Sequence, residues 1–394
     1  MYKNPYILKN GKEHPKYTKT GIWKIRTKHR HDIGLLNSLV LFFKNSNFTV
    51  YDFGCGDASY SKTLIENGID IKCYDGNPNT VTITDGLGEI LDLVSNFELS
   101  LRDWVICFEV GEHIPKEYES KFIENLCKHA TKGIILSWAS IGQSGSGHVN
   151  CQDDTYIRSC LRRYGFVTNK KIENIFKNNI INRKYFRKTI MVFEKLTIEQ
   201  KSENIKLIKH RSEIPTILKT IGLNKKICEL GVFRGKNLWD LAMLSDADLV
   251  VGIDAWDQKI DHLWTQETHD QNYNYVMQKV VEKIKRKCHK IDIKILRGDH
   301  SILVKEFDNE YFDYVYIDSD HSYECVKKDI NQWYPKIKEG GIIAGHDYCK
   351  RTVKRDTGTT VFGVIKAVDE FITNNRINNF YVTPLCQSWI IIKE

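Results

Sequence analysis

An acidic residue two positions ahead of a glycine turn occurs twice in this chain of 394 residues, within Asp52–Gly56 and within Glu229–Gly235. A glycine turn between a strand and a helix lets the backbone approach a nucleotide closely. The carboxylate would repel the pyrophosphate of a dinucleotide, whereas S-adenosylmethionine has no phosphate and carries an ammonium and a sulfonium group. The turns therefore predict one S-adenosylmethionine site in each half of the chain. The residues of the two turns that we expect to bind it are Asp52, Gly54, Gly56, Glu229, Gly231 and Gly235.

Further acidic residues follow the next strand-like run of each half. Asp75 comes after Ile71–Tyr74, and Asp254 comes after Leu249–Ile253. At the carboxyl end of a second parallel strand, a carboxylate can accept hydrogen bonds from both ribose hydroxyls. Asp299, which follows another strand-like run, is a candidate contact for the adenine amino group. The two halves are thus expected to bind the nucleoside with equivalent residues.

These residues need a sheet whose strands end on one side. Short apolar runs rich in Val, Ile and Tyr alternate with longer stretches of helical period, as in a parallel sheet covered by helices. The predicted strands of the first half are Thr49–Phe53, Ile71–Tyr74, Trp104–Val110, Gly133–Trp138 and Thr189–Glu194. Those of the second half are Lys226–Leu230, Leu249–Ile253, Tyr314–Asp318, Gly341–Ala344 and Trp389–Lys393.

Because the order repeats, we predict an α/β fold with two doubly wound, Rossmann-like domains in tandem, at residues 1–197 and 198–394. Leu196–Ser212, which is polar and charged, is the expected connector. Duplication of one architecture is the economical interpretation, and chance similarity between two unrelated parallel-sheet domains stays open.

Composition limits the class of protein. Hydrophobic residues make up 41% and charged residues 27% of the chain, as in ordinary folded globular proteins. The net charge of +8 is spread along the sequence, with basic stretches at Lys24–His31 and Lys283–Lys290, so it does not by itself predict a nucleic-acid partner. The eleven cysteines form no CxxC pair and no apolar run approaches a bilayer span. We expect a soluble, cytoplasmic protein.

Nearly the whole chain resembles the class I S-adenosylmethionine-dependent methyltransferases. Its second half, with DYVYIDSDHSYE at Asp313–Glu324 and KEGGIIAGHDY at Lys338–Tyr348, resembles the branch of macrocin-type sugar O-methyltransferases and cephalosporin-hydroxylase-like proteins. The resemblance implies a sugar or glycan acceptor and a divalent cation, usually Mg²⁺, that lowers the pKa of the acceptor hydroxyl. It also implies metal ligands at Asp318, His346 and Asp347 and a general base at Asp320.

Two histidines of the second half leave alternatives open. His346 is a less natural Mg²⁺ ligand than an oxygen donor, so the cation is either bound differently or His346 is a base or a substrate contact. His321 can deprotonate a hydroxyl, because its ordinary pKa lies near neutrality, or it can be a structural histidine at a helix start.

The first half carries CFEVGEHIP at Cys107–Pro115, which resembles a small group of methyltransferases. Glu109 and His113 are candidates for contact with the methionine moiety or for removal of a proton, while Glu112 can equally cap a turn. The glycine-rich loop that follows the next strand contains His148, which is either the base of the first site or an anchor of the loop. No aspartate here repeats the strand-end pair of the second half, so we expect a first site without a metal.

The leading hypothesis is a bifunctional O-methyltransferase that acts on sugar hydroxyls of a glycan or a nucleotide sugar. An RNA methyltransferase, and one catalytic domain joined to one binding domain, are the alternatives. A dehydrogenase is disfavoured because the third glycine of the dinucleotide fingerprint is replaced by Ser59 in the first turn. Association into homo-oligomers stays open.

Overall fold

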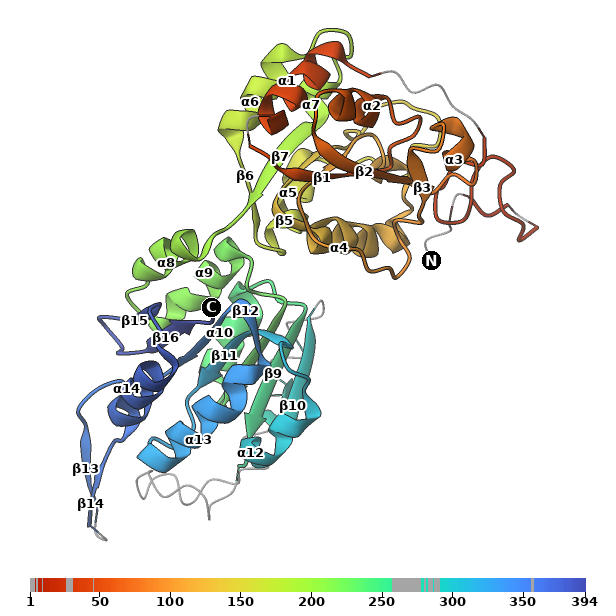
Figure 1. Ribbon diagram of the computed structural model, residues 1–394. Helices are drawn as coiled ribbons and strands as arrows, with labels where there is room; N and C mark the ends of the chain where they lie inside the picture. The colour runs from red at the N-terminus through yellow and green to blue at the C-terminus, as the bar shows by residue number, and fades with distance from the viewer. Residues whose placement is uncertain are drawn as a thin grey trace. The chain divides into compact units, whose positions relative to one another are not determined.

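The computed structural model describes residues 4, 6–8, 10–25, 31–44, 46–256, 278, 279, 281, 282, 286, 291–355 and 358–394. The two basic stretches, Lys24–His31 and Lys283–Lys290, lie largely outside these residues. The chain divides into two compact units, Met1–Lys195 and Leu196–Glu394 (Figure 1). Among the described helices, none combines the length and the apolar character needed to span a membrane.

The first unit is built on a seven-stranded sheet with the order β3-β2-β1-β4-β5-β7-β6. Strands β1 to β5 pair in parallel, whereas β7 pairs antiparallel with both β5 and β6. The strands are β1 Thr49–Phe53, β2 Asp70–Asp75, β3 Gly88–Ile90, β4 Arg102–Cys107, β5 Ala130–Ser137, β6 Phe166–Thr168 and β7 Ile190–Lys195. The carboxyl ends of the parallel strands therefore meet along one edge, where ligands of such sheets bind.

Helices cover both faces of this sheet (Figure 1). Because side chains alternate along a strand, Val50 packs with the core that includes α1, while Tyr51 and Phe53 pack with the core that includes α4. The helices are α1 Ile33–Lys44, α2 Ser59–Glu66, α3 Thr80–Ile83, α4 Glu119–His129, α5 Asp154–Arg162, α6 Lys170–Asn179 and α7 Phe186–Thr189, with 3₁₀ turns η1 Gly111–His113 and η2 Lys116–Tyr118.

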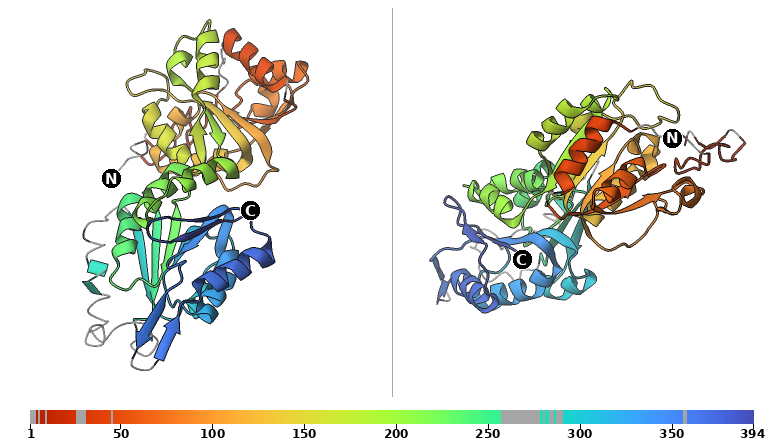
Figure 2. Two further views of the ribbon diagram at one scale, coloured as in Figure 1. Left: turned by 90° about the vertical axis from the view of Figure 1, so that its left-hand side faces the viewer. Right: turned by 45° about the horizontal axis from the view of Figure 1, so that its top comes forward.

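The second unit repeats the arrangement, with the strand order β10-β9-β8-β11-β12-β16-β15 (Figures 1 and 2). Strand β16 is antiparallel to both of its neighbours, as β7 is in the first unit. The strands are β8 Lys226–Leu230, β9 Leu249–Asp254, β10 Asp292–Arg297, β11 Phe312–Ile317, β12 Ile337–Gly345, β15 Phe380–Val382 and β16 Trp389–Ile392. Between β12 and the last helix, α14, the chain forms an antiparallel hairpin of β13 Thr352–Arg355 and β14 Gly358–Val361.

Helices of the second unit also lie on both sides of its sheet. They are α8 Ile198–Lys206, α9 Ile214–Ile221, α10 Lys236–Leu244, α12 His300–Leu303, α13 Tyr323–Trp333 and α14 Val364–Asn375, with 3₁₀ turns η3 Arg211–Glu213, η5 Val304–Glu306 and η6 Tyr334–Lys336. The predicted connector therefore contains α8. Thr197 caps this helix in a capping box with Gln200, and Ile205 is buried in the core of the second unit.

The predicted α/β class with two Rossmann-like sheets is confirmed. The predicted strands lie within four residues of their observed bounds, and the largest difference is at β12, which begins at Ile337 instead of Gly341. The short strands β3, β6 and β15, of three residues each, were not predicted, because so few residues show no periodicity. The predicted strand Trp104–Val110 ends at Cys107, and the following residues turn into η1.

Candidate active sites

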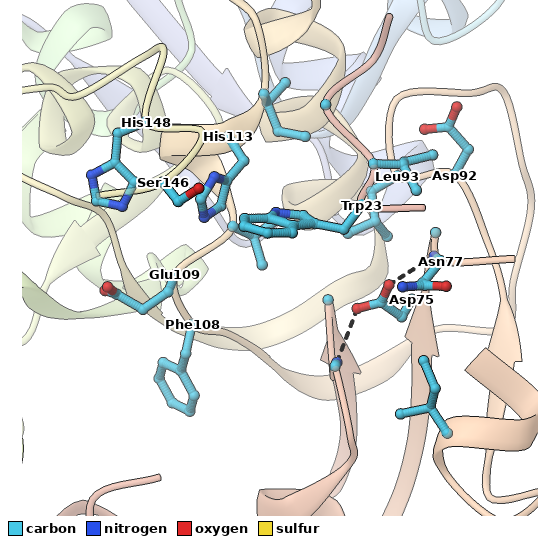
Figure 3. A pocket seen from close by; sticks show the side chains of 18 residues that line it. Trp23, Asp75, Asn77, Asp92, Leu93, Phe108, Glu109, His113, Ser146 and His148 are labelled. Atoms are coloured by element: carbon cyan, nitrogen blue, oxygen red, sulfur yellow. Dashed lines mark hydrogen bonds between the residues drawn. The ribbon is translucent and has the colours of Figure 1, made fainter. Parts of the chain in front are cut away.

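A cavity of about 300 Å³ opens at the carboxyl ends of β1, β2 and β4 in the first unit (Figure 3). Six residues predicted from the sequence line it, namely Gly54, Gly56, Asp75, Glu109, His113 and His148. The remaining wall is largely apolar, with Ile83, Leu93 and Phe108 among its side chains. A pocket with an apolar wall and a few directed polar groups is suited to a small organic ligand.

Asp75 is held at the end of β2 by two backbone hydrogen bonds. The amide of Gly56 donates to Oδ2 over 2.9 Å, and the amide of Asn77 donates to Oδ1 over 2.8 Å (Figure 3). Each carboxylate oxygen keeps a further lone pair for a ligand hydroxyl. The glycine turn and the predicted ribose acid are thus directly connected.

Asp92, which the sequence did not single out, also lines the cavity. It follows β3, and its Oδ1 accepts a hydrogen bond from the amide of Val94 over 3.1 Å while Thr20 donates to its Oδ2 over 3.3 Å. Its place after the third strand corresponds to that of Asp299 in the second unit. The available signal was the repeat itself, but β3 is too short to mark the position.

The N-terminal segment 6–25 supplies part of the cavity wall through Gly21, Ile22 and Trp23. The indole of Trp23 packs edge-on against His113, with 5.5 Å between ring centroids (Figure 3). The hydroxyl groups of Tyr17 and Ser146 lie 3.1 Å apart. This segment was not predicted to belong to the site, because its contacts join residues far apart in the chain.

Asp52 lies behind the first glycine turn and is 3% exposed. The hydroxyl of Ser61 donates to its Oδ2 over 2.6 Å, and burial raises the pKa of this carboxyl to about 7. Asp52 lines a second cavity of about 310 Å³, which shares Gly54 and Glu109 with the first. At Gly54 the backbone has φ of +81°, and a Cβ atom there would come within 2.3 Å of Val110 Cγ2. Glycine is required at this position.

Glu109 lies two residues beyond β4 with a positive φ of 56°, a strained conformation for a residue with a side chain. Its Oε1 accepts a hydrogen bond from Ser137 Oγ over 2.8 Å, and its own amide donates to the same hydroxyl. Burial raises the pKa of the Glu109 carboxyl. The strain and the two hydrogen bonds direct this carboxyl to the boundary of both cavities.

In the second unit a cavity of about 210 Å³ lies beside the second glycine turn. Residues predicted from the sequence that line it are Glu229, Gly231, Asp318, His321, His346 and Asp347. Asn237 Nδ2 donates to Glu229 Oε1 over 3.0 Å, whereas the buried Oε2 has no hydrogen-bond partner among the described residues. Burial raises the pKa of Glu229 well above its ordinary value.

Two carboxylates and two imidazoles gather at the ends of β11 and β12. His321 Nε2 lies 3.6 Å from Asp318 Oδ1 and 3.2 Å from Asp347 Oδ2. His346 Nδ1 lies 3.8 Å from Asp318 Oδ1 and 3.2 Å from Asp347 Oδ1. We call Asp318, His321, His346 and Asp347 the strand-end cluster. It contains all three predicted metal residues and one predicted base.

The charges of the strand-end cluster stabilise one another. Although burial opposes it, hydrogen bonds to Asp318 and Asp347 raise the pKa of His321 to about 9. Burial also opposes ionisation of Asp347, but hydrogen bonds from His321 and His346 hold its pKa well below the ordinary value. Arg211 adds a further cation, since its guanidinium donates to Asp318 Oδ2 over 2.9 Å.

Four predicted residues of the second unit lie outside the lining of this cavity. Asp254 accepts hydrogen bonds from the amides of Phe233 and Trp256 over 2.7 and 2.8 Å. The other three have local structural roles. Asp299 caps α12, Gly235 precedes α10 with φ of +69°, and Asp320 Oδ1 accepts from the amide of Ser322 over 2.6 Å ahead of α13.

The strand-end cluster can be tested as a cation site by its donors. Asp318, His321 and His346 each offer a ligand atom, and these atoms lie within 4.8 Å of one another. A set that mixes imidazole and carboxylate suits Mn²⁺, Fe²⁺, Co²⁺ or Zn²⁺ better than Mg²⁺, which prefers oxygen donors. The donors therefore fit a divalent transition metal.

Comparison with known proteins identifies the second unit. Residues 228–348 match the family model described as "Methyltransferase domain". This range contains the second glycine turn and the whole strand-end cluster, and the prediction of a methyltransferase is confirmed for this unit. No curated protein matches the chain.

Similar solved structures include three methyltransferases. Magnesium protoporphyrin IX methyltransferase from Synechocystis PCC 6803, with bound SAH, has 20% identity, covers 43% of this chain and 90% of its own, and has a TM-score of 0.33. 1,6-Didemethyltoxoflavin-N1-methyltransferase from Burkholderia thailandensis, with bound S-adenosylhomocysteine, has 9% identity, covers 42% of this chain and 80% of its own, and has a TM-score of 0.32. A sugar N-methyltransferase from Streptoalloteichus has 10% identity, covers 41% of this chain and 85% of its own, and has a TM-score of 0.34.

Proposed function

We propose that this chain is a bifunctional S-adenosylmethionine-dependent O-methyltransferase that acts on sugar hydroxyls of a glycan or a nucleotide sugar. The observation that carries the proposal is the strand order that the two units share. In each unit an acidic residue near the end of the first strand precedes a glycine turn, and the second strand ends in a carboxylate that backbone amides hold in place. The sugar acceptor rests on the resemblance of the second half to sugar O-methyltransferases. Each unit is assigned one cofactor.

In the first unit, the cavity of about 300 Å³ provides the groups that the cofactor needs. Asp75 accepts the ribose hydroxyls, and Asp92 with Leu93 lies where the adenine would fit. The carboxyl of Asp52, buried beside the turn, faces the ammonium end of the methionine moiety through the adjoining cavity. A cationic ligand favours ionisation of a carboxyl whose pKa burial has raised.

In the second unit, the strand-end cluster is assigned to the acceptor. Asp318, His346 and Asp347, with His321 beside them, would hold a divalent cation, which when bound lowers the pKa of an acceptor hydroxyl and orients it. Asp318 and Asp347 raise the pKa of His321 to about 9, so His321 is an imidazolium at neutral pH and would accept the hydroxyl proton only once a bound cation had displaced its own proton. Removal of the hydroxyl proton leaves an oxygen nucleophile for in-line attack on the methyl group.

The experiment is a methyl-transfer assay with the full chain, S-adenosylmethionine, Mn²⁺ or Mg²⁺, and a panel of glycans, nucleotide sugars and structured RNA. We expect a mass gain of 14 Da per methyl group on a sugar acceptor, reduced by Asp318→Asn. Methyl transfer to RNA alone would favour the RNA alternative. No mass gain on any sugar, with saturating cofactor and metal, would overturn the proposal.

A single catalytic unit is the second candidate, because the family model matches only residues 228–348. Titration calorimetry with S-adenosylmethionine separates the two. Two equivalents per chain support two active units, whereas one equivalent that is lost in Asp254→Asn and kept in Asp75→Asn assigns the cofactor to the second unit.

A further inference from the structure

We propose that the first unit contains its own divalent transition-metal site, formed by Glu112, His113 and His148 beside the cavity of about 300 Å³. This inference goes beyond the proposed function, which assigns a cation only to the second unit, and it replaces the expectation of a metal-free first site. One ligand atom from each of the three side chains lies within 4.8 Å of the others.

The burial of Glu112 is the first argument for the site. This residue is 0% exposed, and neither oxygen of its carboxylate has a hydrogen-bond partner among the described residues. A buried carboxylate without hydrogen bonds is costly, and such groups in folded proteins are normally paired or coordinate metals. The backbone around it is fixed, since the carbonyl oxygen of Glu112 accepts from the amides of Val149 and Asn150 over 2.9 and 3.0 Å. The backbone that carries the carboxyl group is thus held in place.

The hydrogen bonds of the two histidines are the second argument. His113 Nδ1 lies 2.9 Å from the carbonyl oxygen of Gly147, and His148 Nδ1 lies 3.1 Å from that of Gln143. A carbonyl oxygen only accepts, so Nδ1 carries the proton in both rings and Nε2 carries the lone pair. An Nδ1–H held by a backbone carbonyl is the usual support of an imidazole that binds a metal through Nε2.

The positions of these atoms agree with that tautomer. His148 Nε2 lies 4.0 Å from Glu112 Oε1, too far for a hydrogen bond but suitable for two ligands of one ion. The centroids of the two imidazole rings are 5.2 Å apart (Figure 3). The three ligand atoms are thus close enough to share one ion.

Charge gives a third argument. The half-buried carboxyl of Glu109 neighbours the buried carboxyl of Glu112. A divalent cation would compensate both carboxyl groups at once. Two imidazoles and one carboxylate leave coordination positions open, and this donor set suits Zn²⁺, Fe²⁺, Co²⁺ or Mn²⁺. Because both histidines line the cavity, an open position would be available to an oxygen of a bound ligand.

The test measures metal binding alone and needs neither acceptor nor methyl transfer. The full chain with Asp318→Asn and His346→Asn, which disables the strand-end cluster, is freed of metal with a chelator and titrated with Co²⁺. Visible absorption and calorimetry report the bound ion. We expect one equivalent, which is lost when Glu112→Gln or His148→Gln is added.

Glu124→Gln is the matched control, because Glu124 is an exposed carboxylate on α4 that pairs with Lys121, and this variant should keep the equivalent. Thermal melting verifies that each variant is folded. If Glu112→Gln does not fold, His148→Gln decides, since that side chain is 12% exposed and tolerates substitution better. Absence of Co²⁺ binding in the disabled chain, or retention of the equivalent in His148→Gln, would overturn the proposal. Either result leaves the methyl-transfer proposal standing.

Discussion

Asp75 and Asp254 are held in the same way, although they lie in different units. Each accepts one hydrogen bond from an amide of its own glycine turn and a second from the amide two residues further along the chain. A repeat that extends to individual hydrogen bonds is stronger support for a shared ligand than a repeat of strand order. The first prediction follows from this pair.

Replacing Asp75 or Asp254 by Asn should each remove one of two cofactor sites. The amide retains one acceptor oxygen, so we expect the affinity of the affected site to fall about 10- to 100-fold, as for loss of one charged hydrogen bond. Calorimetry would then detect one site instead of two. Asp85→Asn, at an exposed carboxylate paired with Lys62, should leave both sites intact.

Asp52 should make the stability of the first unit depend on pH. Its pKa is 3.8 in the reference state and about 7 in the folded protein, because burial disfavours the charged form. Between about pH 4 and pH 7 the unfolded chain has lost this proton while the folded chain keeps it, so the free energy of unfolding falls as pH rises, by roughly 1.4 kcal/mol per pH unit. Urea unfolding at pH 5, 6 and 7 should show a flatter profile for Asp52→Asn, and an unchanged slope would contradict the assignment.

Glu173 should make the free energy of unfolding depend on pH in the direction opposite to that of Asp52. It is buried among Arg158, Lys170 and Lys177, and although burial opposes it, their hydrogen bonds lower its pKa to about 2. The contribution is complete above the ordinary pKa of 4.5 and is lost as pH falls toward 2. Glu173→Gln leaves Arg158 with only the exposed carboxylate of Asp154 and should cost about 3 kcal/mol at pH 7.

A matched variant separates this effect from loss of any carboxylate. Glu203 forms an exposed pair with Lys206, and Glu203→Gln should leave the urea midpoint unchanged. If the two substitutions changed the free energy of unfolding equally, the buried ion pairs of Glu173 would stabilise the protein no more than an exposed pair does.

Gly231→Ala should disable the second unit through Asp318. The backbone of Gly231 has φ of +84°, and a Cβ atom would lie 2.1 Å from the carbonyl oxygen of Asp318. The positive φ costs about 1–3 kcal/mol, and the clash must displace the strand end that carries the cluster. We expect loss of metal binding by the strand-end cluster with an unchanged Asp75 site, as read by calorimetry. Retention of both sites would contradict the role of this close approach.

Trp23→Ala should weaken cofactor binding to the first unit, because it removes an aromatic wall of the cavity and the support of His113. We expect a loss of about 10-fold, the effect of roughly 1.4 kcal/mol of packing. Tyr17→Phe, which removes only the hydroxyl contact with Ser146, should have a smaller effect. The affinity of the second unit serves as the internal reference.

The sequence predicted the frame of the fold because its central strands are long, apolar and ordered alike in both halves. It also placed Asp52, Asp75, Glu229 and Asp254 correctly at strand ends, since the position of a residue after a buried strand is a local property. These features depend on patterns of a few neighbouring residues, which one sequence records.

Features that depend on distant parts of the chain were not predictable. Glu112 is consistent with a turn cap in sequence, and only the folded chain shows that its buried carboxyl makes no hydrogen bond among the described residues. Asp92 follows a strand of three residues that has no apolar pattern. The sequence left His321 open between a base and a structural histidine, because its neighbours Asp318 and Asp347 come from the ends of two strands.

The N-terminal segment of the first unit has a consequence for the order in which the protein matures. The hydroxyl of Tyr6 lies 2.6 Å from the carbonyl oxygen of Gly147, which stands 141 positions later in the chain. Tyr6 therefore cannot take its final place until the loop that contains Gly147 has been synthesised. Closure of the first pocket is a late event of folding, and a short nascent chain exposes Tyr6, Tyr17 and Trp23 to chaperones.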